Sequence, residues 1–301
     1  MPAYVISDAA LAEAPTLYSD EAAAALFADP AFPDYLRRSV ATWCGETDDG
    51  PMMTANLRDA RHFITSLMMI HLHTTPGGLT LTRLMEALRL AGMAPARAAP
   101  ALAVTLVLGL IERAPSGDDN RVRAYRPTGR MAAAMIERFR RTLAAAAPLD
   151  PGVARALDRY DDPDFALSLI GQVAEIGLAV NGANAVADDS LSAISTRSSG
   201  MMVLGRLLAL ADREGAAFPP VGPVAFSGAA IARGCGISRT QVRRILRAGA
   251  EAGHFVLVDE GLIELTPRLA EHVAYLCLVE FLACRWAAAR MTAEASVRIS
   301  A

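Results

Sequence analysis

The amino-acid sequence predicts a mainly α-helical protein with two small β-hairpins. Apolar residues recur at helical spacing along most of the chain, and four Asp-Pro or Thr-Pro pairs stand where helices would begin. Strand-like runs that flank a polar turn occur in two places only. A chain of 301 residues that is 53% hydrophobic is also too apolar for general disorder and long enough for more than one domain.

The four proline pairs set the expected starts of helices. In each pair the first residue resembles an N-cap, and the proline takes the first helical position, where its missing N–H is harmless. These pairs are Asp29-Pro30, Asp150-Pro151, Asp162-Pro163 and Thr266-Pro267. They predict helices at roughly 31–44, 151–160, 163–179 and 267–291.

Two regions share one order of elements. The first contains the helical segments "RHFITSLMMIHLHTT", "LTRLMEALRLAG" and "APARAAPALAVTLVLGL", then the hairpin "IERAPSGDDNRVRAYRPT" and a helix from Gly129. The second contains "MMVLGRLLALADREG", a short strand-like "PVAF", "SGAAIARGCG", "SRTQVRRILRAGAEAG", the hairpin "HFVLVDEGLIELT" and a closing helix. Three helices followed by a hairpin is the order of a winged helix-turn-helix domain.

Matching glycines support a structural duplication. Gly92 and Gly236 fall between the second and third helices of their regions, where a positive φ is often required. Gly109 and Gly253 follow the third helices, where a left-handed cap is expected. We therefore expect tandem winged-helix domains with small wings and flanking helices. The predicted segments are an acidic helical N-terminal segment (1–57), a first winged helix (58–147), a helical connector (148–197), a second winged helix (198–275) and a C-terminal helix and tail (276–301).

The third helix of the second region carries the candidate functional residues. Ser238 is a good N-cap, and helical spacing puts Val242, Ile245, Leu246 and Gly249 on one packed face. Polar and basic residues are left on the other face: Arg239, Thr240, Gln241, Arg243, Arg244 and Arg247. Arginine and glutamine pair with guanine and adenine edges, and arginine also contacts phosphates, so this face suits the major groove of DNA.

The stretch "GISRTQVRRILRAGAEAGHFVLVDEGLIELT" resembles the helix-turn-helix and wing of bacterial winged-helix transcription regulators. "GLIERAPSGDDNRVRAYRPTGR" is similar to the wing of the MarR-like group. The resemblance covers about 60–145 and 198–275. It implies transcription regulation through binding of double-stranded DNA by the six residues above, assisted by the arginines of the first wing, Arg121, Arg123 and Arg126.

The two copies depart from this pattern in opposite ways. The first copy has a basic wing, but its third helix carries only Arg97, and the second has a basic helix with an acidic turn at Asp259-Glu260. Either the two copies combine, or one serves as a scaffold or dimerisation domain. Two alternatives therefore stay open: a winged-helix protein–protein interaction or scaffold protein without DNA binding, and a basic helix that is an ordinary solvated face.

The charge distribution and the absence of catalytic motifs limit the other functions that the sequence could support. The net charge is −3, but residues 1–50 hold nine acids against two arginines, which leaves the remainder mildly basic. The sequence shows no Gly-rich phosphate loop, nucleophile elbow or zinc-binding motif, so we expect no enzyme, cofactor or metal site. The apolar runs at 98–111 and 269–291 favour buried helices over membrane spans. We expect a cytoplasmic protein, and leave open a homodimer and a small-molecule effector.

Overall fold

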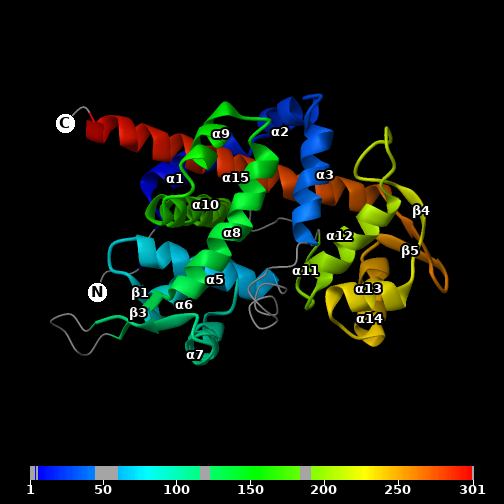
Figure 1. The fold of residues 1–301 in the computed structure, drawn as a ribbon, viewed down its shortest axis with the longest axis horizontal. Coiled ribbons are helices and arrows are strands. Elements are labelled where there is room, and N and C mark those ends of the chain that lie inside the picture. Colours follow the sequence, from blue (N-terminus) through cyan, green and yellow to red (C-terminus); the bar gives the residue numbers. More distant parts are fainter. Residues whose placement is uncertain (1–3, 5, 45–59, 116–122, 184–190, 300–301) are drawn as a thin grey trace. The chain divides into compact units, whose positions relative to one another are not determined.

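The structure is a computed structural model that describes residues 4, 6–44, 60–115, 123–183 and 191–299. These residues are mainly α-helical and include two three-stranded antiparallel sheets (Figure 1). The predicted class, mainly α with small β elements, is therefore confirmed. The chain divides into two compact units: unit 1 comprises residues 1–24, 62–187 and 281–301, and unit 2 comprises 25–61 and 188–280. The five segments expected from the sequence stay a prediction.

Unit 1 consists of helices and one small three-stranded sheet. Its elements are α1 (Asp8–Leu17), most of α2 (Asp20–Phe27), α5 (Ala60–Thr74), β1 (Leu79–Thr80), α6 (Leu81–Leu90), the 3-10 turn η1 (Pro95–Arg97), α7 (Ala98–Val107), β2 (Ile111–Arg113), β3 (Ala124–Pro127), α8 (Gly129–Ala146), α9 (Pro151–Asp158), α10 (Pro163–Ala183) and the C-terminal part of α15 (Pro267–Ile299). The sheet has the order β1-β3-β2, with Leu79 opposite Tyr125 and Ile111 opposite Pro127. Buried Leu84, Leu88 and Leu102 belong to its core.

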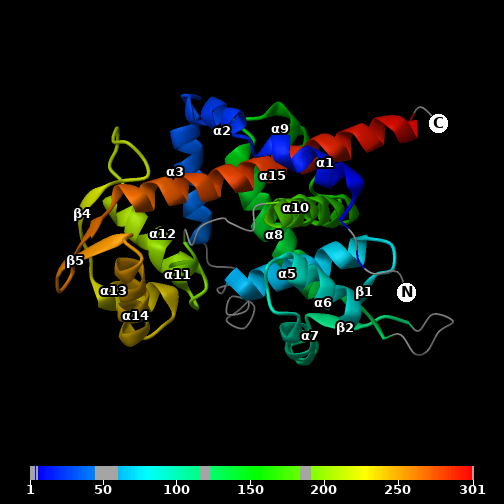
Figure 2. The same cartoon turned by 180° about the vertical axis from the view of Figure 1, so that it is seen from behind.

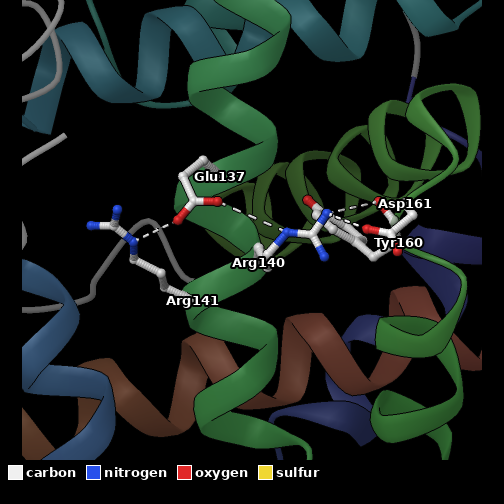
Figure 3. A network of polar contacts seen from close by, with 5 residues as sticks. All are labelled: Glu137, Arg140, Arg141, Tyr160 and Asp161. Carbon is white, nitrogen blue, oxygen red and sulfur yellow. Dashed lines mark hydrogen bonds and ion pairs between the residues drawn. The ribbon is translucent and has the colours of Figure 1, made fainter. Parts of the chain in front are cut away.

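Arg140 on α8 joins that helix to the turn after α9. The Arg140 guanidinium bonds to the carboxylate of Asp161 at 2.9 Å and to the carbonyl of Tyr160 at 3.4 Å (Figure 3). The neighbouring Arg141 donates to Glu137, one turn earlier on α8, at 2.9 Å. These groups are partly exposed, so the network orients the α9–α10 turn more than it stabilises the unit.

The N-terminal residues of unit 1 are tied down by a buried polar group on α5. His71 lies between the Tyr4 hydroxyl, 2.6 Å from Nε2, and the carbonyl of Gly171, 2.8 Å from Nδ1. Since the carbonyl can only accept, Nδ1 carries the proton and Nε2 accepts from Tyr4. Burial lowers the pKa of His71 and raises that of Tyr4, so both groups stay neutral near pH 7.

Unit 2 contains a second small sheet and its own helices. Its elements are α3 (Phe32–Trp43), α11 (Ser192–Ser195), α12 (Gly200–Ala211), β4 (Gly222–Ala225), α13 (Gly228–Cys235), α14 (Arg239–Glu251), β5 (Phe255–Asp259), β6 (Leu262–Leu265) and the N-terminal part of α15. The sheet has the order β4-β6-β5, with Val224 opposite Ile263. α3 packs on α15, where the Tyr35 hydroxyl donates to the Cys277 carbonyl at 2.7 Å.

Both units contain one order of elements: helix, strand, two helices, then two strands, with the third strand between the first and second in the sheet. The four matched glycines adopt the positive φ expected from the sequence. Gly92 and Gly236 have φ of 71° and 62°, and Gly109 and Gly253 have φ of 65° and 77°. The strand β1, which the sequence did not predict, is the only two-residue strand among the described ones.

Three of the four predicted helix starts are confirmed. The side chains of Asp150, Asp162 and Thr266 accept N–H groups in the first turns of α9, α10 and α15. The fourth expected helix, at roughly 31–44, is present as α3, but Asp29 is not its N-cap: the Asp29 carboxylate instead accepts the N–H of Ala31 at 2.8 Å, which closes a turn around the proline. Consequently α3 begins at Phe32.

Two helices in the described part of the chain are long and apolar enough to cross a membrane by length and composition alone. They are α10, over Pro163–Val180, and α15, over Pro267–Thr292. In these windows 67% and 61% of the residues, respectively, are buried inside the protein. Because the core helix of a soluble protein passes the same test, this is weak evidence for a membrane.

Candidate nucleic-acid interface

The turn between α13 and α14 is fixed by local capping. Ser227 begins α13 by accepting the N–H of Ala230, and Gly236 ends that helix in the left-handed conformation. Two residues later Ser238 begins α14, its hydroxyl accepting the N–H of Gln241 at 3.1 Å. Both N-caps are serines, so short side chains set the start of each helix and thereby the angle at which α14 leaves the turn.

One face of α14 is buried as the helical spacing predicted. Val242, Ile245, Leu246 and Gly249 are all buried, together with Ala248. Gly249 allows a close approach, because a Cβ there would lie 2.3 Å from Cε2 of Phe255 on β5. The glycine therefore permits the aromatic ring of β5 to lie against the helix backbone. α14 also lies beside α13 (Figures 1 and 2).

The opposite face of α14 is basic and solvent-exposed. Arg239, Thr240, Arg243, Arg244 and Arg247 are exposed, and Gln241 is half-buried. Arg239, Arg243 and Arg247 recur every four residues, and Arg244 lies next to this row, so their charges share a single face. The positive end of the helix dipole lies at the same end as Arg239. This surface attracts anions, and its side chains can donate several hydrogen bonds at once.

Two features beside this basic face were not foreseen. Glu260, in the turn between β5 and β6, forms an ion pair with Arg243 at 3.5 Å, with 91% and 75% of the two side chains exposed. The second feature is an open hollow of about 430 Å³ at the turn, bordered by Arg233 and Arg239. A partner that contacts Arg243 must therefore compete with a carboxylate of the protein itself.

Arg206 on α12 holds the C-terminal end of α13, just before the turn to α14. Its guanidinium donates to the carbonyl of Gly234 at 2.7 Å, and a Cβ at Gly234 would lie 2.6 Å from Cζ of Arg206. Any side chain at Gly234 would therefore displace the arginine. The sequence contains a signal for this contact only in Gly234, the first glycine of "RGCG", whose partner 28 residues away is not visible from local spacing.

The third helix of unit 1 has a different surface. On α7, Val104 and Val107 are 53% and 86% exposed, and no charged residue lies between Ala98 and Val107. Pro100 lies in the first turn of α7, where no N–H is needed. α7 thus presents valines where α14 presents arginines.

The wing arginines predicted as DNA contacts lie in unit 1, and the α14 residues lie in unit 2. Arg123 and Arg126 are exposed, and Arg126 forms an ion pair with Glu112 of the neighbouring strand at 2.6 Å. Arg121 lies outside the described residues. The structure thus exposes five of the six α14 residues on one helix of unit 2, with Gln241 half-buried, and exposes Arg123 and Arg126 in unit 1.

Metal-binding side chains do not gather in the part of the chain that the structure describes: no group of three or more His, Cys, Asp or Glu is placed to hold an ion. The four cysteines are free thiols, three of them buried. In comparisons with known proteins, no family model, no curated protein and no solved structure matches this chain.

Proposed function

We propose that the protein is a DNA-binding transcription regulator that contacts duplex DNA through the exposed face of α14. The observation that carries this proposal is the placement of Arg239, Arg243, Arg244 and Arg247 in solvent on one helix whose other face is buried. Each arginine that meets a phosphate releases counterions from the duplex, and those near base edges can select guanine. A cytoplasmic location belongs to the same proposal.

The arrangement of elements supports a tandem winged-helix fold for this role. In such domains the third helix enters the major groove, and the hairpin after it contacts the flanking backbone. α14 is the third helix of the repeated order in unit 2 and follows a short capped turn. The basic residues lie mostly in its first two turns, which are the ones nearest the base edges in this geometry.

The wings have unequal roles in this proposal. The β5–β6 turn carries Asp259 and Glu260, whose charge disfavours phosphate contact, so α14 carries the affinity in unit 2. The first wing, with Arg121, Arg123 and Arg126, assists if both units face one duplex. Recognition is non-covalent and requires neither a cofactor nor a metal.

The exposed valines of α7 favour a second candidate function, a winged-helix protein–protein interaction or scaffold protein. An apolar third helix cannot donate to base edges, whereas it can bury surface against another protein. The two functions can also be divided between the units, with α7 binding protein and α14 binding DNA.

Fluorescence anisotropy with labelled genomic duplex fragments tests the proposal. The informative variant is Arg244→Ala/Arg247→Ala, because Arg243 is already engaged with Glu260. The control is Arg155→Ala/Arg213→Ala, which removes the same charge at exposed positions outside α14. We expect the α14 variant to bind at least tenfold more weakly than the control. Equal affinity of the two variants, or no binding by the unmodified protein at low salt, would overturn the proposal.

A further inference from the structure

The described sheets have four outer strands: β1 and β2 in unit 1, and β4 and β5 in unit 2. An outer strand presents N–H and C=O groups that a further strand can pair with, and proteins commonly prevent this by short strands, charges or proline. Three of these outer strands carry such a device. β1 has two residues, β2 exposes Glu112 and Arg113, and β4 contains Pro223.

β5 has less of this protection, because its one charged residue, Asp259, is the last of the strand and its register shift lies at the same end. It is five residues long and is paired on one side only, with β6. Val256, Leu257 and Val258 are 50%, 50% and 54% exposed, so three consecutive apolar side chains lie in solvent. A register shift between Leu257 and Asp259 bends the strand near its end but does not cover these side chains. Apolar exposure on a weakly protected edge is typical of a strand that pairs with another chain.

We propose that β5 is a self-association site, where β5 of a second copy of this chain adds antiparallel about a two-fold axis. The charges at its two ends indicate this occupant. Asp259 and Glu260 lie at the C-terminal end, whereas Arg268 lies beside Gly253, just before the N-terminal end. Antiparallel pairing centred on Leu257 brings the acidic end of each strand to the Arg268 end of the other. The surface is thus complementary to itself, as a two-fold interface requires.

The size of the strand pair sets the expected affinity of the dimer. Two five-residue strands bury less surface than a standard protein–protein interface, so the dimer should dissociate at micromolar concentrations. Self-association does not depend on DNA binding. If the proposed function also holds, the dimer presents two copies of α14 to two half-sites, which raises affinity through linked binding.

Sedimentation equilibrium of the full chain without DNA, from about 1 to about 100 µM, tests this site directly. Val256→Lys/Val258→Lys places two charges on the edge, and Leu210→Lys/Val221→Lys is the control, with both side chains 55% exposed elsewhere in unit 2. We expect the unmodified chain and the control to dimerise with rising concentration, and the edge variant to stay monomeric. Circular dichroism checks that each variant is folded.

A charge exchange gives a second test that leaves the apolar residues in place. Glu260→Arg and Arg268→Glu should each weaken dimerisation severalfold at low salt, and the double variant should restore it. A monomeric unmodified chain over the whole range would overturn the proposal. So would an edge variant that dimerises like the control, or a double charge variant that fails to recover while remaining folded. Because no DNA is present, these outcomes are independent of the proposed function.

Discussion

Replacing Glu260 by glutamine should strengthen DNA binding, because it releases Arg243. The two groups lie 3.5 Å apart with most of each side chain in water. At the dielectric constant of water, Coulomb's law gives their attraction as about 1 kcal/mol. Exposed pairs contribute about 0–1 kcal/mol once side-chain entropy is included. A gain of up to about 1 kcal/mol corresponds to up to about fivefold higher affinity.

The measurement is the dissociation constant for duplex DNA, by fluorescence anisotropy at low and moderate salt. Glu214→Gln is the matched control, since it removes one exposed carboxylate of unit 2 away from α14. Glu260→Gln should bind more tightly than this control, and the difference should shrink as salt screens the charges. It should disappear when Arg243→Ala is also present. Weaker binding by Glu260→Gln, or equal gains in the two variants, would refute the role given to Arg243.

Two further predictions concern stability. Gly249→Ala should lower the free energy of unfolding, measured in urea, by about 1–3 kcal/mol, because the new Cβ meets the buried Phe255 ring. Adding Phe255→Leu to the same chain should recover part of this loss. An unchanged urea midpoint for Gly249→Ala would contradict the prediction. Burial lowers the pKa of His71 from 6.5, so the unfolded chain takes up its proton first. The free energy of unfolding should then fall as the pH drops below about 6.5, and it should fall less steeply in His71→Gln. Urea unfolding at about pH 7.5 and about pH 5 measures both changes. Equal losses in the two proteins would contradict the prediction.

Local sequence signals predicted much of the fold. The caps at Asp150, Asp162, Thr266 and Ser238 depend on side chains that bond within three residues, so spacing along the chain is enough to find them. The buried face of α14 follows from helical periodicity in the same way. Asp29-Pro30 shows the limit of this approach. The same residue pair can close a turn instead of beginning a helix, as the bond from the Ala31 N–H to Asp29 shows.

Contacts between distant residues could not be predicted from spacing. The bond from Arg206 to Gly234 joins residues 28 apart, and the one from Tyr4 to His71 joins residues 67 apart. The pairing of Arg243 with Glu260 depends on how the β5–β6 turn lies over the helix. The sequence identified both residues and the acidic character of the turn, but only the fold shows that one neutralises the other.

The salt dependence of duplex binding tests most directly whether α14 is the DNA-contacting surface. The slope of log K against log salt counts the phosphates that the protein neutralises, at about 0.9 per contact. If Arg244 and Arg247 contact phosphates, the Arg244→Ala/Arg247→Ala variant should have a slope shallower by about 2 than that of the unmodified protein. The Arg155→Ala/Arg213→Ala control should keep the full slope. Equal slopes for the α14 variant and the control would contradict the account and leave α14 as a solvated basic face.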